Sequence, residues 1–193
     1  MANPARQITV AGLLLCAVLS AGAWGAARQA EVSELRAGPG VERELKGGES
    51  HSYRIALATG QYLQVVVEQK GVDVVVRLFG PDGKQLTEVD SPNGTQGPEP
   101  VSWIAETAGE YRLEVKAPDE KAVPGRYEIK VEALREATAK DRQRVAAERL
   151  LGEAEQLRAQ ATAAALRQAI EKYNEALALL RKAEDQQGEA NTL

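Results

Sequence analysis

Residues 127–150 read YEIKVEALREATAKDRQRVAAERL, and the periodicity of the apolar residues changes within this stretch. As far as Val131, apolar and polar residues alternate, which is typical of a strand with one buried face. Beyond Thr138, Ala and Leu recur at spacings of three and four residues, which is typical of an amphipathic helix. The stretch therefore predicts a β domain that is followed directly by a helical segment.

Upstream of this stretch, short alternating runs are separated by Gly, Pro, Asp and Asn. The run Val74-Val75-Val76 predicts a strand buried on both faces, and GPDG at 80–83 predicts a hairpin turn. Short strands at intervals near ten residues predict an all-β sandwich, jelly-roll-like, with about eight antiparallel strands. The expected strands span 41–46, 50–58, 61–70, 73–79, 85–89, 101–106, 110–116 and 126–131. The expected core consists of Ile55, Leu57, Val65, Val67, Val74, Val76, Leu113, Val115, Ile129 and Val131.

The helical segment, residues 138–193, predicts an α-helical hairpin. Thr138 and Asp141 fit a capping box, in which each side chain bonds a backbone N–H of the other residue. The first helix is expected over 140–160 and the second over 164–184. The inward line of the first helix is expected to hold Ala147, Leu150 or Leu151, Ala154 and Leu157. On the second helix the inward seam is expected to hold Leu166, Ile170, Tyr173, Leu177 and Leu180.

The first 25 residues have the order of a secretory signal peptide. Arg6 is their only charge, residues 8–20 are mostly apolar, and residues 21–26 (AGAWGA) supply small side chains for cleavage. The apolar run is shorter than the roughly 20 residues that span a bilayer. An extracytoplasmic protein, periplasmic or secreted, is therefore expected. The alternative is a membrane anchor formed by residues 8–24. Residues 26–40 then form a loosely ordered lead-in, and the sandwich covers 41–132.

Charge and cysteine content exclude several functions. Cys16 is the only cysteine and leaves with the signal peptide, so disulfides, thiol nucleophiles and cysteine metal sites are not expected in the exported chain. Residues 26–132 hold 13 Lys and Arg against 18 Asp and Glu, whereas residues 133–193 hold 10 of each. An acidic β domain beside a neutral helical one argues against nucleic acid as a partner, because that partner needs a basic face.

The sequence offers no set of catalytic residues. His51 is the only histidine, and it lies between Ser50 and Ser52. Adjacent strand residues point to opposite faces, and there is no G-x-S-x-G turn, so a Ser-His nucleophile is not expected. His51 is expected to be an exposed strand residue. The tyrosines Tyr53, Tyr62, Tyr111 and Tyr127 are expected to pack at the edge of the core, with their hydroxyls at the rim.

Oxygen ligands for calcium are the one metal chemistry that the sequence suggests. Asp73, Asp90 and Asn93 are the candidates, with Asp82 explained equally well as a turn residue. The EF-hand spacing is absent. No other cofactor is expected.

The β half resembles the bacterial pre-peptidase C-terminal domain. The resemblance is carried by SHSYRIALATGQYL (50–63), DVVV (73–76), LFGPDG (78–83), GEYRL (109–113) and GRY (125–127). The resemblance implies a β-sandwich, and some relatives of that sandwich use calcium for order.

AIEKYNEAL (169–177) resembles the second helix of a tetratricopeptide repeat, in which Ala169, Tyr173 and Ala176 are the packing positions. GEANTL (188–193) resembles the start of a further repeat. The order of signal peptide, sandwich and repeat is similar to large exported bacterial proteins that end in a caspase-like CHAT peptidase domain. The resemblance implies that this chain is the N-terminal piece of such a protein.

These observations predict a non-enzymatic, exported binding module. The sandwich would recognise or target, and the helices would dock a partner protein or peptide. The alternative is a calcium-dependent accessory domain that targets a secreted peptidase to its substrate. A membrane is expected to be involved only through an uncleaved N-terminal segment.

Overall fold

The computed structural model describes residues 32–192, in which nine strands and three helices are found. The signal peptide, residues 1–25, and the alternative anchor, residues 8–24, lie outside the described residues. No helix within 32–192 is both long and apolar enough to cross a membrane. The strands are β1 Val32–Glu34, β2 Val41–Leu45, β3 Ser50–Leu57, β4 Gln61–Lys70, β5 Val75–Phe79, β6 Gln85–Val89, β7 Gln96–Ile104, β8 Gly109–Lys116 and β9 Gly125–Glu136. The helices are α1 Ala139–Ala159, α2 Ala163–Ala183 and α3 Gln186–Thr192.

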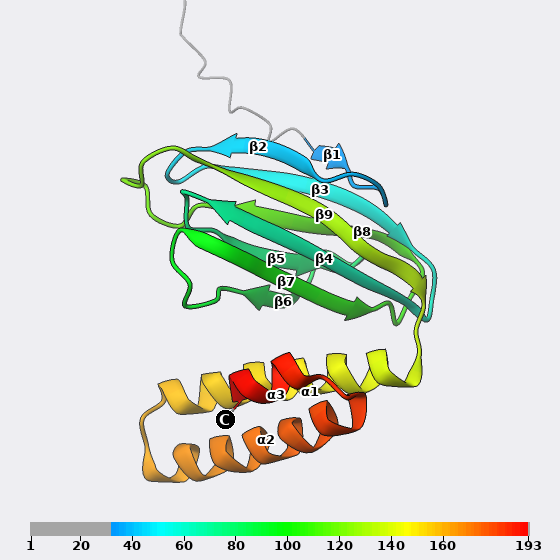
Figure 1. The fold of residues 1–193 in the computed structure, drawn as a ribbon, viewed down its shortest axis with the longest axis vertical. Helices are drawn as coiled ribbons and strands as arrows, with labels where there is room; N and C mark the ends of the chain where they lie inside the picture. Colours follow the sequence, from blue (N-terminus) through cyan, green and yellow to red (C-terminus); the bar gives the residue numbers. More distant parts are fainter. Residues whose placement is uncertain (1–31, 193) are drawn as a thin grey trace, which may run out of the picture.

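The strands form two sheets that pack face to face, so the predicted β-sandwich is confirmed (Figure 1). One sheet has the order β1-β3-β8-β5-β6 and the other β2-β9-β4-β7. All ten residues of the expected core lie in one buried cluster between the sheets. The Val74–Val76 run is buried, and β5 lies between β8 and β6 and does not form an edge.

The sandwich begins earlier than expected, because part of the lead-in is a strand. β1 pairs in parallel with β3, and the N–H of Leu35 donates to the carbonyl of Arg54 at 2.8 Å. Leu35 is buried in the core between the sheets. The description of residues 26–40 as a loosely ordered lead-in was therefore wrong for residues 32–35. A parallel partner about twenty residues away leaves no local pattern from which it could be predicted.

β7 also begins earlier than expected. The loop predicted over residues 90–100 ends at Thr95, and Pro98 and Pro100 lie within the strand. β7 is the last strand of its sheet and pairs with β4 without a break through both prolines. Proline is tolerated on an edge strand when its missing N–H faces away from the sheet. The prolines therefore mark an edge strand instead of a loop.

β9 continues to Glu136, and α1 starts three residues later at Ala139. The additional residues of β9 pair with β4 beyond an irregularity at Gln64 and Val65. The sandwich thus extends past residue 132, and little chain remains between sheet and helix. In Figure 1 the helices lie along one side of the sandwich, with α1 nearest to β7.

The two long helices pack through small residues. Both start close to the expected positions, and the capping box of Thr138 and Asp141 is confirmed. On α1, Ala147 and Ala154 are buried as expected. The residues that α2 buries are Ala165, Ala169, Ala176, Leu180 and Ala183. α3 follows a left-handed residue, Glu184, and packs back against α2.

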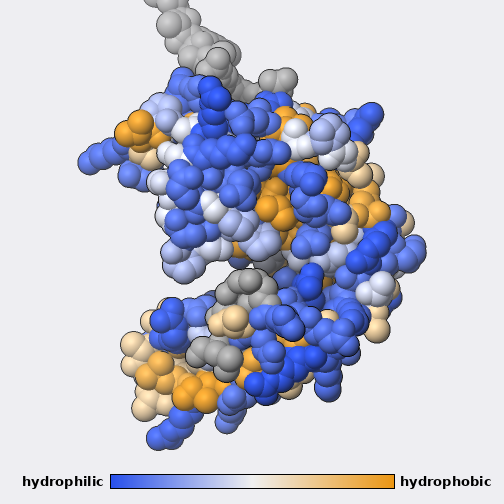
Figure 2. Space-filling view, viewed as in Figure 1, coloured by the Kyte–Doolittle hydropathy of each residue, from blue (hydrophilic) through white to orange (hydrophobic). Residues whose placement is uncertain are grey.

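The predicted seam of α2 was wrong at Leu166 and Ile170, which are 41% and 60% exposed. The buried line is shifted by about one residue around the helix, so that alanines face α1. Small side chains allow two helices to approach closely, and this close approach leaves the larger residues at the side. Figure 2 shows apolar surface at the end of the hairpin where α1 and α2 meet.

Candidate functional site

The calcium candidates lie around the loop that connects β6 to β7. Asp90 is close enough to Asp73 and Glu88 for their charges to affect it. Burial, followed by these two carboxylates, raises the pKa of Asp90. The side chain of Asn93 is already engaged in hydrogen bonds within the protein. Its Oδ1 accepts from Gln69 Nε2 at 2.7 Å, and its Nδ2 donates to the Pro98 carbonyl at 3.1 Å. Asp82 Oδ1 accepts from the Lys84 N–H at 3.1 Å, which confirms its role as a turn residue.

A buried polar network beside this loop was not predicted. Gln69 Nε2 donates to Glu99 Oε1 at 3.0 Å, and Gln69 Oε1 accepts from the Val74 N–H at 2.7 Å. Glu99 is fully buried, and its Oε2 accepts from the Ser91 N–H at 2.9 Å. A signal was available in the sequence. Gln69 and Glu99 both fall on the inward phase of their strands, where polar residues are buried only with partners.

This network holds the loop by hydrogen bonds within the protein. Burial raises the pKa of Glu99, and the hydrogen bonds from Ser91 oppose that rise. Within residues 32–192, no group of three or more His, Cys, Asp and Glu side chains is arranged so that it could hold a metal ion. Gln69 Oε1 and Glu99 Oε2 accept from backbone N–H groups, and Glu99 Oε1 accepts from the Gln69 side chain, so these oxygens serve the fold.

His51 is tied to the core by a chain of tyrosines. Its Nδ1 lies 2.6 Å from the hydroxyl of Tyr127, which in turn lies 2.6 Å from the hydroxyl of Tyr53. The expectation that His51 is exposed was wrong, since it is half-buried. The hydroxyls of Tyr53 and Tyr127 meet inside the sandwich, and burial raises the pKa of both. These polar atoms connect β3 of one sheet with β9 of the other.

The repeat-like positions of α2 face α1 to different degrees. Ala169 and Ala176 are buried, whereas Tyr173 is partly exposed and donates its hydroxyl hydrogen to Glu155 on α1. The adjoining face of α2 carries Leu166 and Ile170. We call this pair the α2 apolar face. These two are the large apolar side chains that the hairpin leaves exposed within residues 32–192.

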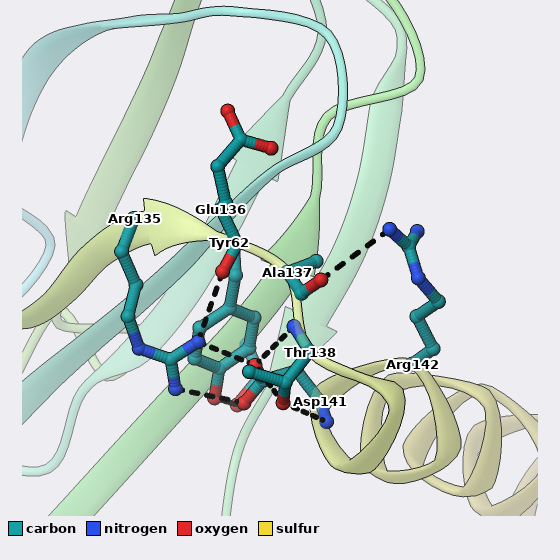
Figure 3. Close-up of polar contacts among 8 residues, drawn as sticks. Tyr62, Arg135, Glu136, Ala137, Thr138, Asp141 and Arg142 are labelled. Carbon is teal, nitrogen blue, oxygen red and sulfur yellow. Dashed lines mark hydrogen bonds and ion pairs between the residues drawn. The ribbon is translucent and has the colours of Figure 1, made fainter.

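The junction between sandwich and helices is held by a charged pair (Figure 3). Arg135, at the end of β9, donates to both oxygens of Asp141 in the first turn of α1, at 2.5 and 3.0 Å. Asp141 also accepts from the backbone N–H of Thr138 at 2.8 Å. The Arg135 guanidinium lies 5.1 Å from the ring centre of Tyr62. The hydrogen bond from Arg135 is the main reason that the pKa of Asp141 is well below its usual range.

Asp141→Ala should weaken the contact between the end of β9 and the start of α1. The substitution removes the capping box, which is worth about 1–2 kcal/mol, and it also removes the acceptor of Arg135. We expect faster hydrogen exchange in the first two turns of α1 and unchanged exchange in β3 and β8. Asp119→Ala serves as a control, because Asp119 accepts a similar turn hydrogen bond from the Lys121 N–H in an exposed loop. Equal acceleration in α1 for both variants would contradict the role of Asp141.

A second charged group lies where α1 covers the outer face of the sheet. Glu148 lies close to the buried Ser102 of β7. Arg144, one turn earlier, forms an ion pair with Asp185 with 2.6 Å between Nε and Oδ2. Burial raises the pKa of Glu148 to about 7, with Ser102 and Arg144 opposing the rise and Asp185 adding to it. The charge of this side chain thus changes near neutral pH.

A third contact joins α1 to the edge of the sandwich. The Arg149 guanidinium lies 5.2 Å from the ring centre of Trp103, and its Nη2 is 3.5 Å from Glu106 Oε1. Each of these three contacts between α1 and the sandwich includes a charged side chain. Domain interfaces of this polar kind usually permit relative motion.

Comparison with known proteins gives similarity at the level of structure. No family model matches the sequence, and no curated protein matches it. The pre-peptidase C-terminal domain of a collagenase from Bacillus anthracis is 19% identical, with 54% of this chain and 98% of that chain covered and a TM-score of 0.44. PliG from Salmonella Typhimurium, a periplasmic lysozyme inhibitor of g-type lysozyme, is 20% identical, with 53% and 99% covered and a TM-score of 0.39. PliG from Aeromonas hydrophila is 13% identical, with 52% and 96% covered and a TM-score of 0.38.

Proposed function

We propose that this protein is a non-catalytic, exported binding module that docks another protein on its helical hairpin. The observation that carries the proposal is the α2 apolar face, where Ile170 is 60% exposed while alanines of the same helix are buried. A helix that exposes large apolar residues beside a well-packed inner face has a second surface available for contact. Recognition of an apolar helical face is a common mode of binding between proteins.

The chemistry of the remaining polar groups supports a binding role. His51, Gln69 and Glu99 are engaged in hydrogen bonds that connect parts of the sandwich. Such groups stabilise a scaffold, whereas catalysis needs polar groups that converge on a reacting atom. On this proposal the sandwich is a pre-peptidase-like domain and the hairpin is a tetratricopeptide-like unit, with Ala169, Tyr173 and Ala176 at its packing positions.

Cross-linking from the α2 apolar face tests the proposal. A photoreactive benzoylphenylalanine placed at position 170 should give one discrete protein adduct in the exported fraction of an expressing bacterium. Leu166→Asp in the same chain should remove the adduct, because a buried carboxylate is costly in an apolar contact. The same photoreactive residue at position 120, in the exposed loop before β9, is the control. Identical adducts from positions 120 and 170 would contradict a specific docking face.

The calcium-dependent alternative depends on Asp73, Asp90 and Asn93. Asn93 is held by Gln69 and by the Pro98 carbonyl, and the described residues contain no metal-binding group of three acidic or histidine side chains. No observation of the described residues favours this alternative over docking on the hairpin.

A further inference from the structure

A small hollow lies at one end of the sandwich, where the turn after β5 meets the turn before β8. Its volume is about 320 Å³. It is lined by Gly80, Pro81, Asp82, Leu86, Trp103, Glu106, Thr107 and Tyr111. We call it the Trp103 hollow. Its size is at the lower limit of ligand sites, so it has room for one long side chain together with its peptide group.

The inner wall of the Trp103 hollow is apolar and aromatic. Trp103 is 8% exposed, and Tyr111 is buried beside it. The Tyr111 hydroxyl donates to the Thr107 carbonyl at 2.8 Å, which fixes the ring. The indole N–H of Trp103 has no hydrogen-bond acceptor within the described residues. The rings of Trp103 and Tyr111 form an apolar wall against which an alkyl chain can pack.

The rim carries two carboxylates, Asp82 and Glu106. Asp82 Oδ2 lies 3.0 Å from Nζ of Lys84, a side chain two residues away that is mostly exposed. Glu106 lies 3.5 Å from Arg149. Exposed ion pairs of this kind are weak, so another cation can replace Lys84 beside Asp82 or Arg149 beside Glu106.

The protein already places a cation at this corner. Arg149 of α1 lies over the Trp103 ring and beside Glu106, and together these give a cation–π contact and an ion pair. The carboxylate Asp82 lines the same hollow. An aromatic wall under a pair of carboxylates is complementary to a side chain with an alkyl stem and a positive end.

We propose that the Trp103 hollow binds a lysine or arginine side chain of an extended segment of the partner protein, with its stem against Trp103 and Leu86 and its cation between Asp82 and Glu106. This inference rests on the proposed binding function and assigns it a second contact, on the sandwich. Arg149 and the cation of the partner compete for Glu106. Occupation of the hollow therefore weakens one of the contacts that hold α1 to the sandwich.

Titration with short peptides tests this assignment. The full chain with Trp24→Phe keeps Trp103 as its only tryptophan, so one indole N–H signal in a ¹H–¹⁵N spectrum reports on the hollow. Acetyl-Gly-Lys-Gly-amide should shift that signal. Acetyl-Gly-norleucine-Gly-amide, which has the same stem without the charge, should bind at least about threefold more weakly. Equal binding of the two peptides would overturn the proposal.

Substitutions at the rim separate the cation site from general packing. Asp82→Asn with Glu106→Gln keeps the turn acceptor of residue 82 and removes both charges, and it should weaken the lysine peptide about three- to tenfold. Arg149→Gln should tighten it, because Glu106 then loses its competitor. Glu120→Gln, in the loop between β8 and β9, should have no effect. A lysine peptide that tightens with Arg149→Gln and weakens with the rim variant supports the site.

Two outcomes separate this proposal from others. If cellobiose shifts the indole signal and the lysine peptide does not, the hollow is a carbohydrate site and the proposal is overturned. If the lysine peptide leaves the Trp103 indole signal unchanged while cross-linking from position 170 still gives a discrete adduct, the proposed binding in the Trp103 hollow is overturned. In that case the proposed docking on the hairpin is retained.

Discussion

Raising the pH from 5 to 8 should weaken the contact between α1 and the sandwich by up to about 3 kcal/mol. The reason is Glu148, whose pKa rises from an ordinary 4.5 to about 7 where α1 covers Ser102. Between pH 4.5 and pH 7, the Glu148 carboxyl is protonated in the docked state and has lost its proton in the undocked state. Docking is therefore strongest below pH 4.5, and this contribution is lost as the pH rises through 7.

Hydrogen exchange of the α1 amides, corrected for the intrinsic effect of pH, measures this contribution. Protection around residues 142–150 should decrease from pH 5 to pH 8, while protection in β3 and β8 stays constant. Glu148→Gln should abolish the change and keep the protection seen at low pH, because the amide carries no charge. Glu171→Gln, on the exposed side of α2, is the control. A pH dependence that survives Glu148→Gln would show that another group is responsible.

Gln69→Leu should destabilise the sandwich by about 2–4 kcal/mol. Leucine has a similar size but makes no hydrogen bonds, so the Val74 N–H and Glu99 Oε1 each lose a buried partner. Unsatisfied buried groups cost about 1–3 kcal/mol each, although the loop over residues 90–95 can relax and admit water. Urea unfolding followed by Trp103 fluorescence, in the Trp24→Phe background, measures the loss.

A neighbouring position supplies the control for this prediction. Gln64 lies on the opposite phase of the same strand and is partly exposed, so Gln64→Leu should change stability by less than about 0.5 kcal/mol. The pair Gln69→Leu and Glu99→Leu should cost less than the sum of the two single substitutions, because the two residues share one hydrogen bond. Equal losses for Gln64→Leu and Gln69→Leu would mean that the network does not stabilise the fold.

The sandwich could be predicted because its signals are local. Alternation along β4 and β9 identifies the inner face, and GPDG at 80–83 identifies the turn between β5 and β6. The capping box at Thr138 is similarly a property of four consecutive residues. Each of these features is determined within one turn or one strand, so a single sequence is sufficient to predict it.

Features that depend on distant residues could not be predicted in this way. The pairing of β1 with β3 is set by Leu35 filling a place in the core, and no nearby residue signals it. The face of α2 that turns inward is decided by how closely α1 can approach alanines, so the larger residues Leu166 and Ile170 gave the wrong seam. From the sequence, Glu148 is expected to be a solvated charge on a helix. Only the fold places Ser102 of β7 close to it and buries its carboxyl.

The candidate site divides in the same way. Ala169, Tyr173 and Ala176 were named from the resemblance of one nine-residue stretch to a tetratricopeptide helix, whereas the rim of the Trp103 hollow combines Asp82 and Glu106 from two separate turns. Asp90 and Asn93 lie in the loop between β6 and β7, and Asp73 lies in the segment between β4 and β5, but Asn93 is bonded to Gln69, which the sequence did not single out. Proximity along the chain indicated the loop, and only the fold shows which of its atoms are already used.

Pro98 and Pro100 affect how copies of this protein can aggregate. Because β4 pairs with β7 through both prolines without interruption, their missing N–H groups face the open side of the sheet. A strand from a second molecule that approached this side would lack two hydrogen-bond donors, because Pro98 and Pro100 have no backbone N–H. Templated growth of a continuous intermolecular sheet is blocked there, as in other proteins that protect an open edge. At high protein concentration, contacts through side chains should therefore be favoured over fibrous assembly from this edge.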